Sequence, residues 1–230
     1  MDINKIHNQD CLKALKLMQD NQFDLAIVDP PYGIKKHNTI GAGTIGKRIE
    51  RNGKTTYIKR MNKNTKNWDN EPPNIKYFKE LIRVSRNQII WGANHFIENI
   101  PSANSSSWIV WDKKNGKTYQ SDCELAYTSF KKAVRKFSYL WSGMIQEQQD
   151  KNLVEKRIHP TQKPVKLYEW LLMNYAKEGD KILDTHLGSG SIAIACHNLG
   201  YDLTGYELDK EYYDNAIKRI KNHQAQTRIF

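Results

Sequence analysis

Cysteine is scarce in this sequence, and the long apolar runs of membrane proteins are absent. Its three cysteines, Cys11, Cys123 and Cys196, lie far apart and form no Cys-x-x-Cys pair, which excludes a disulfide framework and a zinc knuckle. No apolar stretch approaches the roughly 18 residues of a transmembrane helix. The polar N-terminus lacks the apolar core of a signal peptide. These absences favour a protein of the reducing cytoplasm without a membrane partner.

The chain of 230 residues is long enough for one α/β domain with its own core, and we expect a single domain over residues 1–230. Hydrophobic residues make up 39% of it, too many for a disordered protein. Short apolar runs at 23–28 and 182–184 and the alternating aromatics of 137–141 are typical of strands, and residues 11–18 and 168–175 have helical periodicity. This alternation predicts an α/β fold, a doubly wound and mostly parallel sheet with helices on both faces.

Acidic residues are almost absent from residues 33–67, where ten lysines and arginines stand against Glu50 alone, a net charge of +9 within a total of +11. The segment is rich in Gly and Asn and lacks apolar periodicity, so we expect a structureless, mobile insertion. It is either a solvated surface loop or an arm that binds DNA phosphates. The phosphate-binding candidates are Lys35, Lys36, Lys47, Arg48, Arg51, Lys54, Lys59 and Arg60.

A glycine-rich turn follows the expected strand at 182–184. Gly188, Gly190 and Ala193 fit the pattern G-x-G-x-x-A, and Glu207 ends the next expected strand, where a carboxylate grips a ribose in dinucleotide folds. This pattern alone leaves three interpretations open: a nucleoside-cofactor site, a nicotinamide or flavin enzyme, or glycines that serve only strand–helix packing.

The tetrapeptide Asp29-Pro30-Pro31-Tyr32 ends the apolar strand at 23–28 and is more specific. The exocyclic amine of a base is a poor nucleophile, because its lone pair is delocalised into the ring. A fixed carboxylate and a free backbone carbonyl can hold the two N–H groups of such an amine, and a tyrosine offers a face on which the base can stack. The alternative is a proline-rich turn that ends a strand.

These two motifs, with His159-Pro160-Thr161-Gln162-Lys163-Pro164 and with Asp10-Cys11, resemble the motifs of S-adenosylmethionine-dependent DNA amino methyltransferases. The catalytic motif comes first and the glycine motif last, which is the order of that family's beta group. The resemblance therefore implies a Rossmann-like methyltransferase sheet with a basic insertion, and a target-recognition region at 113–156.

The resemblance also implies roles for single residues. The catalytic residues would be Asp29, Pro30, Pro31 and Tyr32. The cofactor-binding residues would be Asp10, Cys11, Asp29, His159, Thr161, Lys163, Asp184, His186, Leu187, Gly188, Ser189, Gly190, Ser191 and Glu207. The family's glycine motif usually reads Asp-Pro-Phe where this chain has Asp184-Thr185-His186, and we expect His186 to pack or to hydrogen-bond. No metal is expected, because neither His159 nor His186 has metal ligands around it.

The activity implied by the resemblance is methyl transfer from S-adenosylmethionine to the N6 amine of a flipped-out adenine, at a specific short sequence in double-stranded DNA. Cytosine N4 and RNA remain alternative targets, and an NAD-dependent enzyme is the alternative outside methyl transfer. The sequence leaves open a homodimer and a cognate restriction endonuclease. We expect the protein in the cytoplasm of a bacterial or phage-infected cell.

Overall fold

The computed structural model describes residues 4–34, 46–49, 55–58, 71–116, 121–142, 145–148, 150 and 154–225. The chain divides into two compact units. One is formed by Met1–Pro30 together with Pro73–Phe230, and the other by Pro31–Pro72. The first unit holds the large sheet and the helices, and the second holds a pair of short strands.

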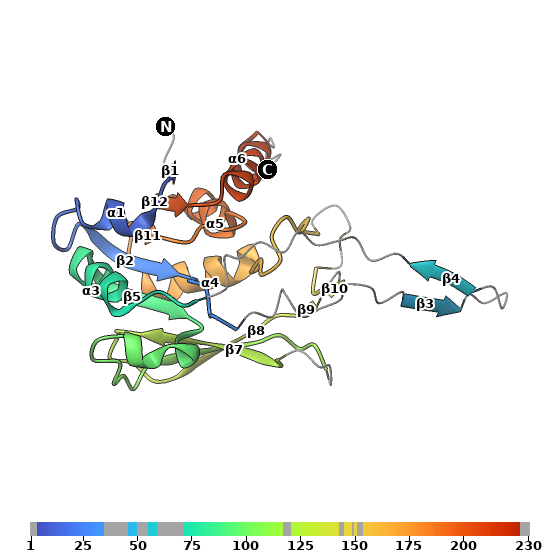
Figure 1. Cartoon of the computed structure of the whole chain (residues 1–230), viewed down its shortest axis with the longest axis horizontal. Helices are drawn as coiled ribbons and strands as arrows, with labels where there is room; N and C mark the ends of the chain where they lie inside the picture. The colour runs from blue at the N-terminus through green and yellow to red at the C-terminus, as the bar shows by residue number, and fades with distance from the viewer. Residues whose placement is uncertain are drawn as a thin grey trace. The chain divides into compact units, whose positions relative to one another are not determined.

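A mixed sheet forms the centre of the first unit (Figure 1). Within the described residues it has eight strands in the order β1-β12-β11-β2-β5-β7-β6-β8. Neighbouring strands from β1 to β5 are parallel, β7 is antiparallel to both β5 and β6, and β8 is parallel to β6. The predicted mostly parallel sheet is therefore confirmed. In sheet order, the strands are Asn4–Asn8, Asp202–Glu207, Lys181–Asp184, Phe23–Val28, Ser85–Trp91, Cys123–Thr128, Trp108–Asp112 and Arg135–Ser138.

Helices cover both faces of the sheet, as the doubly wound fold predicts. From β1 to β2 and on to β5, the chain moves along the sheet in one direction, through α1 and α3. From β11 to β12 it moves in the opposite direction, through α5. Because such crossovers are right-handed, opposite directions place the helices on opposite faces. Accordingly, α1 packs on α3, whereas α4 and α6 pack on α5. These helices are Cys11–Leu15 (α1), Ile75–Val84 (α3), Val165–Tyr175 (α4), Ser191–Leu199 (α5) and Lys210–Gln224 (α6).

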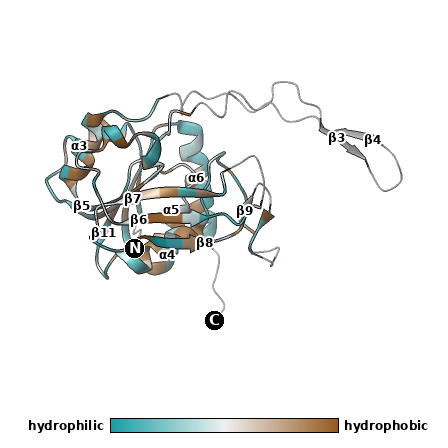
Figure 2. Cartoon of the chain, turned by 90° about the horizontal axis from the view of Figure 1, so that it is seen from below, coloured by the Kyte–Doolittle hydropathy of each residue, from teal (hydrophilic) through white to brown (hydrophobic). Residues whose placement is uncertain are grey.

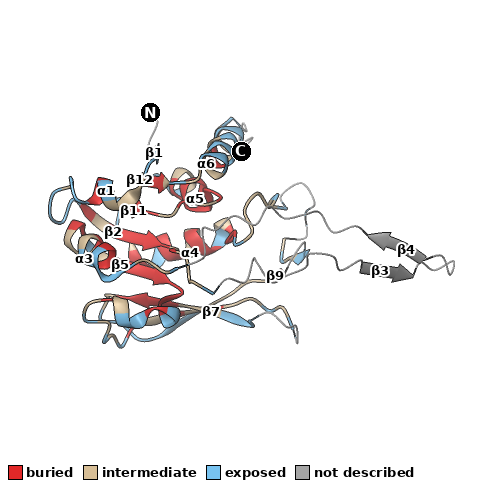
Figure 3. Cartoon of the chain, viewed as in Figure 1, coloured by how far each residue is buried: buried red, intermediate tan, exposed pale blue. Residues whose placement is uncertain are grey.

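The core lies in the central strands and the helix faces that cover them. Strand β2 is buried along its length except at the half-buried Asp24, because helices cover both faces of a parallel sheet. Most residues of β5 and α5 are buried as well, as Figure 3 shows. Helix α6 is mostly hydrophilic in Figure 2, and its buried residues are Ala216 and Ile220. It is an outer helix with one apolar stripe.

Two element boundaries differ from the sequence prediction. The first helix ends at Leu15, although the periodicity extends to Met18. The Arg83 guanidinium donates to the carbonyl oxygens of Leu15 and Met18 at 2.8 Å each, so a side chain from α3 satisfies carbonyls that another helical turn would have used. The expected strand at 137–141 is divided between β8, which ends at Ser138, and β9 (Trp141–Ser142), which pairs with β10 (Ile145–Gln146).

The second unit contains an antiparallel pair, β3 (Gly46–Ile49) and β4 (Thr55–Ile58). The prediction of a structureless segment at 33–67 is therefore wrong for these two strands. The missed signal is the β-branched and aromatic run Thr-Thr-Tyr-Ile of β4. At the start of this unit, Gly33 has φ +72°, and a Cβ there would lie 2.6 Å from Pro72 Cδ, so only glycine fits this left-handed position. The mobility of the insertion stays a prediction.

Candidate active site

Four acidic residues predicted from the sequence follow neighbouring parallel strands of the sheet. Glu207 ends β12 and Asp184 ends β11, whereas Asp10 and Asp29 follow β1 and β2. Parallel strands place their carboxyl ends at one edge of the sheet, and ligands bind where the crossovers change direction. That change falls between β11 and β2. The fold therefore brings all four carboxylates to the edge where a ligand is expected.

The glycine turn is tied to the end of β12. Glu207 accepts hydrogen bonds from the N–H groups of Gly188 at 2.8 Å and Asp209 at 2.9 Å. Gly190 has φ +73°, and a Cβ there would lie 3.0 Å from Ile220 Cδ1 on α6. Glycine at this position thus serves both the turn and the close approach of α6. The loop presents backbone N–H groups next to a carboxylate, a combination that suits a nucleoside ligand.

The buried Asp184 and the half-buried His186 lie at the same edge. Asp184 is 2% exposed and accepts the backbone N–H of His186 at 2.9 Å. Burial raises the pKa of Asp184 to about 8, the N–H of His186 opposes the rise, and Asp29 and Glu207 add to it. Burial lowers the pKa of His186 to about 4. At neutral pH this edge therefore holds a largely protonated carboxyl group and a neutral imidazole.

His186 contacts two side chains, as a packing and hydrogen-bonding residue should. Its Nδ1 lies 2.9 Å from Thr185 Oγ1, and its ring meets the Tyr77 ring edge-on at 5.4 Å. Tyr77 comes from α3, and its hydroxyl lies 2.6 Å from Thr185 Oγ1. Sequence reasoning missed Tyr77, because its position on the apolar face of α3 resembles that of an ordinary core residue.

The other half of the site is a chain of alternating charges around Lys163. The Lys163 ammonium is 2.5 Å from Asp29 Oδ2 and 3.1 Å from Glu124 Oε2. Glu124 Oε1 is in turn 2.6 Å from the Lys113 ammonium. Lys163 is 4% exposed, and the buried Trp91 ring lies 5.4 Å from its nitrogen. We call Lys113, Glu124, Lys163 and Asp29 the charged cluster.

Ion pairing sets the protonation states within the charged cluster. Burial alone would lower the pKa of Lys163, but Asp29 and Glu124 outweigh it, so the pKa lies above its usual value. Burial would raise the pKa of Glu124, yet Lys163 and Lys113 lower it to about 2. Lys163 and Glu124 are both charged at neutral pH. Sequence reasoning missed Glu124 and Lys113, which have no motif around them.

The segment at 159–164 runs beside the glycine turn. The His159 ring meets the Tyr212 ring of α6 at 4.3 Å, and its Nδ1 lies 3.1 Å from Thr161 Oγ1. A Cβ on Gly188 would lie 3.7 Å from the His159 ring. The structure therefore brings His159 and Thr161 to the loop predicted to bind the cofactor.

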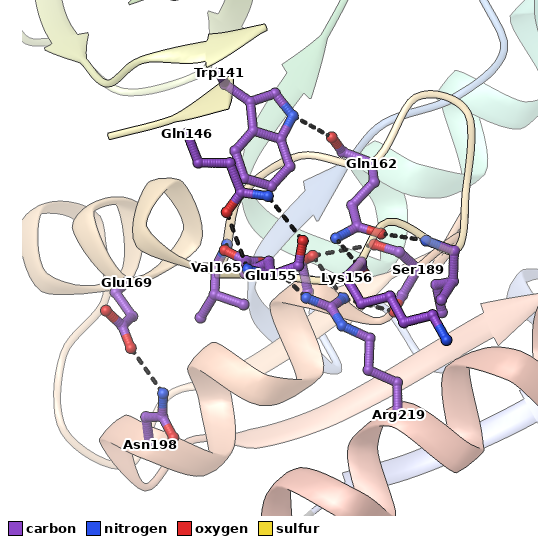
Figure 4. A network of polar contacts seen from close by, with 12 residues as sticks. Trp141, Gln146, Glu155, Lys156, Gln162, Val165, Glu169, Ser189, Asn198 and Arg219 are labelled. Carbon is purple, nitrogen blue, oxygen red and sulfur yellow. Dashed lines mark hydrogen bonds and ion pairs between the residues drawn. The ribbon is translucent and has the colours of Figure 1, made fainter. Parts of the chain in front are cut away.

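Arg219 of α6 connects the glycine loop to Glu155 through hydrogen bonds and an ion pair (Figure 4). Its Nη1 donates to Ser189 O and to Ser191 Oγ, both at 2.9 Å, and its Nη2 lies 2.6 Å from Glu155 Oε2. The second oxygen of Glu155 accepts the N–H of Val165 at 2.8 Å, at the first residue of α4. Neither Arg219 nor Glu155 was predicted. Ser189, Ser191, Glu155 and Arg219 are called the loop brace below.

The other residues predicted from the sequence lie partly in described elements and partly outside the described residues. Cys11 is half-buried at the start of α1, where Asp10 accepts the N–H of Leu12 at 2.9 Å, and Leu187 is buried under the loop. Pro30 is buried in the first unit, whereas Pro31 and Tyr32 begin the second. The backbones of Lys47 and Arg48 lie in β3. The predicted DNA contacts outside the described residues are Lys35, Lys36, Arg51, Lys54, Lys59 and Arg60.

The part of the chain that the structure describes contains neither a metal-binding group nor a membrane-spanning helix. Among those residues, no three side chains of the metal-ligating types come together. Among their helices, none combines the length and the apolar character needed to cross a bilayer.

Comparison with known proteins places this geometry in context. A protein-family model of the N6/N4 type, described as a DNA methylase, matches residues 23–218. The type II methyltransferase M2.DpnII of Streptococcus pneumoniae is 23% identical over 93% of this chain and 88% of its own length. M.HpaI of Haemophilus parainfluenzae, also a type II methyltransferase, is 25% identical over 91% of this chain and 71% of its own. The crystal structure of an M1.HpyAVI–SAM complex shares the fold, with a TM-score of 0.54 at 20% identity over 94% of this chain and 99% of that one.

Proposed function

The chain belongs to the N6/N4 DNA methylase family, and from this premise we propose that it methylates the N6 amine of a flipped-out adenine in double-stranded DNA, at a specific short sequence. The observation that carries the proposal is the position of Asp29. It heads the Asp-Pro-Pro-Tyr motif and follows a strand that lies beside the one ending in Asp184. The target amine and the methyl donor would then meet at the switch point of the sheet.

The donor set at that edge fits S-adenosylmethionine, the cofactor named in the M1.HpyAVI complex. Glu207 offers carboxylate oxygens for a ribose diol, and Asp10 lies at the neighbouring strand end for the adenine. Asp184 is buried and its pKa is raised, so a cation bound nearby would lower that pKa and favour the ionised carboxylate. Bound S-adenosylmethionine would supply an electrophilic methyl group on a sulfonium sulfur.

Within this function the chain's own residues position and polarise the amine. The Asp29 carboxylate and the Pro30 carbonyl would each accept one N–H of the amine, which concentrates its lone pair on nitrogen. The amine nitrogen would displace S-adenosylhomocysteine from the methyl carbon, so the C–S bond would break as the N–C bond forms. The nitrogen would gain a positive charge, which Asp29 would stabilise before the extra proton leaves to solvent. Tyr32 would stack on the flipped base, which offsets part of the few kcal/mol that flipping costs.

Adenine rather than cytosine is proposed because the motif begins with Asp29 in place of serine, by resemblance to the family. The test is to incubate DNA from a methylation-free host with labelled S-adenosylmethionine and to analyse the nucleosides. We expect N6-methyladenine. N4-methylcytosine would refute the choice of base, and label found only in RNA would refute the choice of nucleic acid. Binding of NADH without any response to S-adenosylmethionine would refute the proposal as a whole.

Asp29→Asn tests the catalytic assignment with a matched control. It keeps the side-chain shape and one acceptor oxygen but removes the negative charge that polarises the amine, so turnover should fall by about 100-fold or more while cofactor affinity changes little. Asp24→Asn on the same strand is the control. Asp24 accepts the N–H of Lys181 at 3.0 Å, which an amide oxygen can accept as well, and its ion pair with Arg86 at 3.4 Å is exposed and contributes little. Turnover of Asp29→Asn within about tenfold of wild type would refute the assignment.

The proposal extends to the setting of the reaction. We infer that the protein works in the cytoplasm of a bacterial or phage-infected cell, as the bacterial relatives suggest, and that residues 113–156 read the target sequence. A homodimer and a cognate restriction endonuclease stay predictions. Light scattering of the purified protein tests the first, and a search for sequence-specific cleavage blocked by the methylation tests the second.

A further inference from the structure

Glu124 of the charged cluster takes no part in the proposed reaction, yet its carboxylate and that of Asp29 both contact the Lys163 ammonium. We propose that Glu124 is a positioning residue that draws Lys163 partly away from Asp29, so that Asp29 keeps an oxygen and a negative field for the target amine. This inference rests on the proposed function and adds one residue to it.

The difficulty that Glu124 resolves is visible in the geometry. A cation 2.5 Å from Asp29 Oδ2 uses one of the lone pairs that the amine needs. It also repels the positive charge that develops on the amine nitrogen during methyl transfer, and such repulsion is strong in a site shielded from water. The Lys163 side chain is 3% exposed, so water cannot take over the ammonium. A second anion within contact distance of the ammonium can.

Glu124 is placed to be that anion. It lies in β7 directly opposite Trp111 of β6, and Lys113 follows β6. The antiparallel pair of strands thus holds Glu124 and Lys113 in fixed register. With Oε1 on Lys113 and Oε2 on Lys163 at 3.1 Å, Glu124 binds the two cations at once. Asp29 and Glu124 compete for the Lys163 ammonium, and Lys113 and Lys163 compete for the Glu124 carboxylate. The balance between these pairs decides how closely Lys163 approaches the catalytic carboxylate.

Removing the charge of Glu124 should therefore slow the chemical step. Glu124→Gln keeps the size of the side chain and leaves Lys163 on Asp29 alone. We expect single-turnover methyl transfer to fall by about tenfold to a hundredfold, with the Kd of S-adenosylmethionine unchanged within about twofold. The matched control is Asp214→Asn, because Asp214 pairs with Lys210 at 2.5 Å on the exposed surface of α6, outside residues 113–156. This control should retain wild-type turnover.

A second variant separates positioning from scaffolding. Lys113→Gln removes the rival cation from Glu124, so Glu124 should hold Lys163 more strongly, and any loss of turnover should be much smaller than that of Glu124→Gln. A loss equal to that of Glu124→Gln would mean that the cluster is only a scaffold, and would overturn the inference.

The effect of Glu124→Gln should also disappear in a Lys163→Gln background, since Glu124 acts through that ammonium. An equal loss in both backgrounds would overturn the inference as well. If wild-type protein transfers no methyl group to DNA, the proposed function fails. If it does, and Glu124→Gln matches it, the inference about Glu124 alone fails.

Discussion

Replacing Arg219 by methionine should destabilise the protein far more than a surface substitution does. The change removes two hydrogen bonds to the glycine loop and the ion pair with Glu155. The pair is mostly shielded, with 13% of the Arg219 side chain and 16% of the Glu155 side chain exposed. Removing one partner of such a pair leaves a buried charge uncompensated, so we expect a loss of about 3 kcal/mol in the free energy of unfolding.

Urea unfolding of the folded, monodisperse protein measures this loss, and the pH dependence checks its cause. Burial already raises the pKa of Glu155 against the opposing effect of Arg219. Without Arg219 that pKa rises further, and protonation of Glu155 then relieves the unpaired charge. The deficit of Arg219→Met should therefore shrink as the pH falls from about 8 towards about 5. A deficit that does not change with pH would contradict this electrostatic explanation.

The control for Arg219→Met lies in the same helix. Lys210 pairs with Asp214 at 2.5 Å, but 69% and 56% of these two side chains are exposed, so Lys210→Gln should cost less than about 0.5 kcal/mol. In a double-mutant cycle, Arg219→Met and Glu155→Gln should couple by about 2 kcal/mol. Additive effects, or a loss below about 1 kcal/mol for Arg219→Met, would refute the reasoning.

Three further predictions follow from the site and the insertion. Because burial raises the pKa of Asp184 to about 8, binding of S-adenosylmethionine near neutral pH should release about one proton, which calorimetry in buffers of different ionisation enthalpy measures. Because burial lowers the pKa of His186 to about 4, acidification from about pH 7 to about pH 5 protonates this histidine only in the unfolded chain and destabilises the protein, and His186→Phe should reduce that loss in urea unfolding. Log affinity for DNA falls linearly with log salt concentration, and replacing Lys47, Arg48 and Arg51 by alanine should make this slope shallower by up to about three units. An unchanged slope would mean that the segment is a solvated loop.

The sequence predicts where the acids of the candidate site lie, because each one marks the end of a strand, whereas their roles stay predictions. Asp184 and Glu207 each end a short run that the structure confirms as a strand, and Asp29 stands before two prolines that end β2. Because alternating strands and helices predict a parallel sheet, the carboxyl ends of these strands are expected at one edge of it. Local pattern and fold agree here, which is why the prediction succeeds.

The residues that the sequence could not predict are those held by long-range pairing. Glu124 meets Lys113 only through the register of β6 and β7, and it meets Lys163 only because the segment at 159–164 reaches the end of β2. Arg219 lies on a mostly hydrophilic helix, where an arginine resembles any solvated residue. No spacing in the sequence distinguishes these side chains from the surface charges around them. Their partners are set by tertiary structure.

The proposed target-recognition region also supplies residues to both halves of the active site. Residues 113–156 contribute Lys113 and Glu124 to the charged cluster, and Glu155 to the loop brace. Exchanging this region for that of a relative with another target should therefore change the rate as well as the site of methylation. A chimera without counterparts of Glu124 and Glu155 should be slower by about tenfold or more, and restoring these two glutamates should recover the rate without restoring the original target. Full activity of the chimera without them would show that target reading and catalysis are separable in this fold.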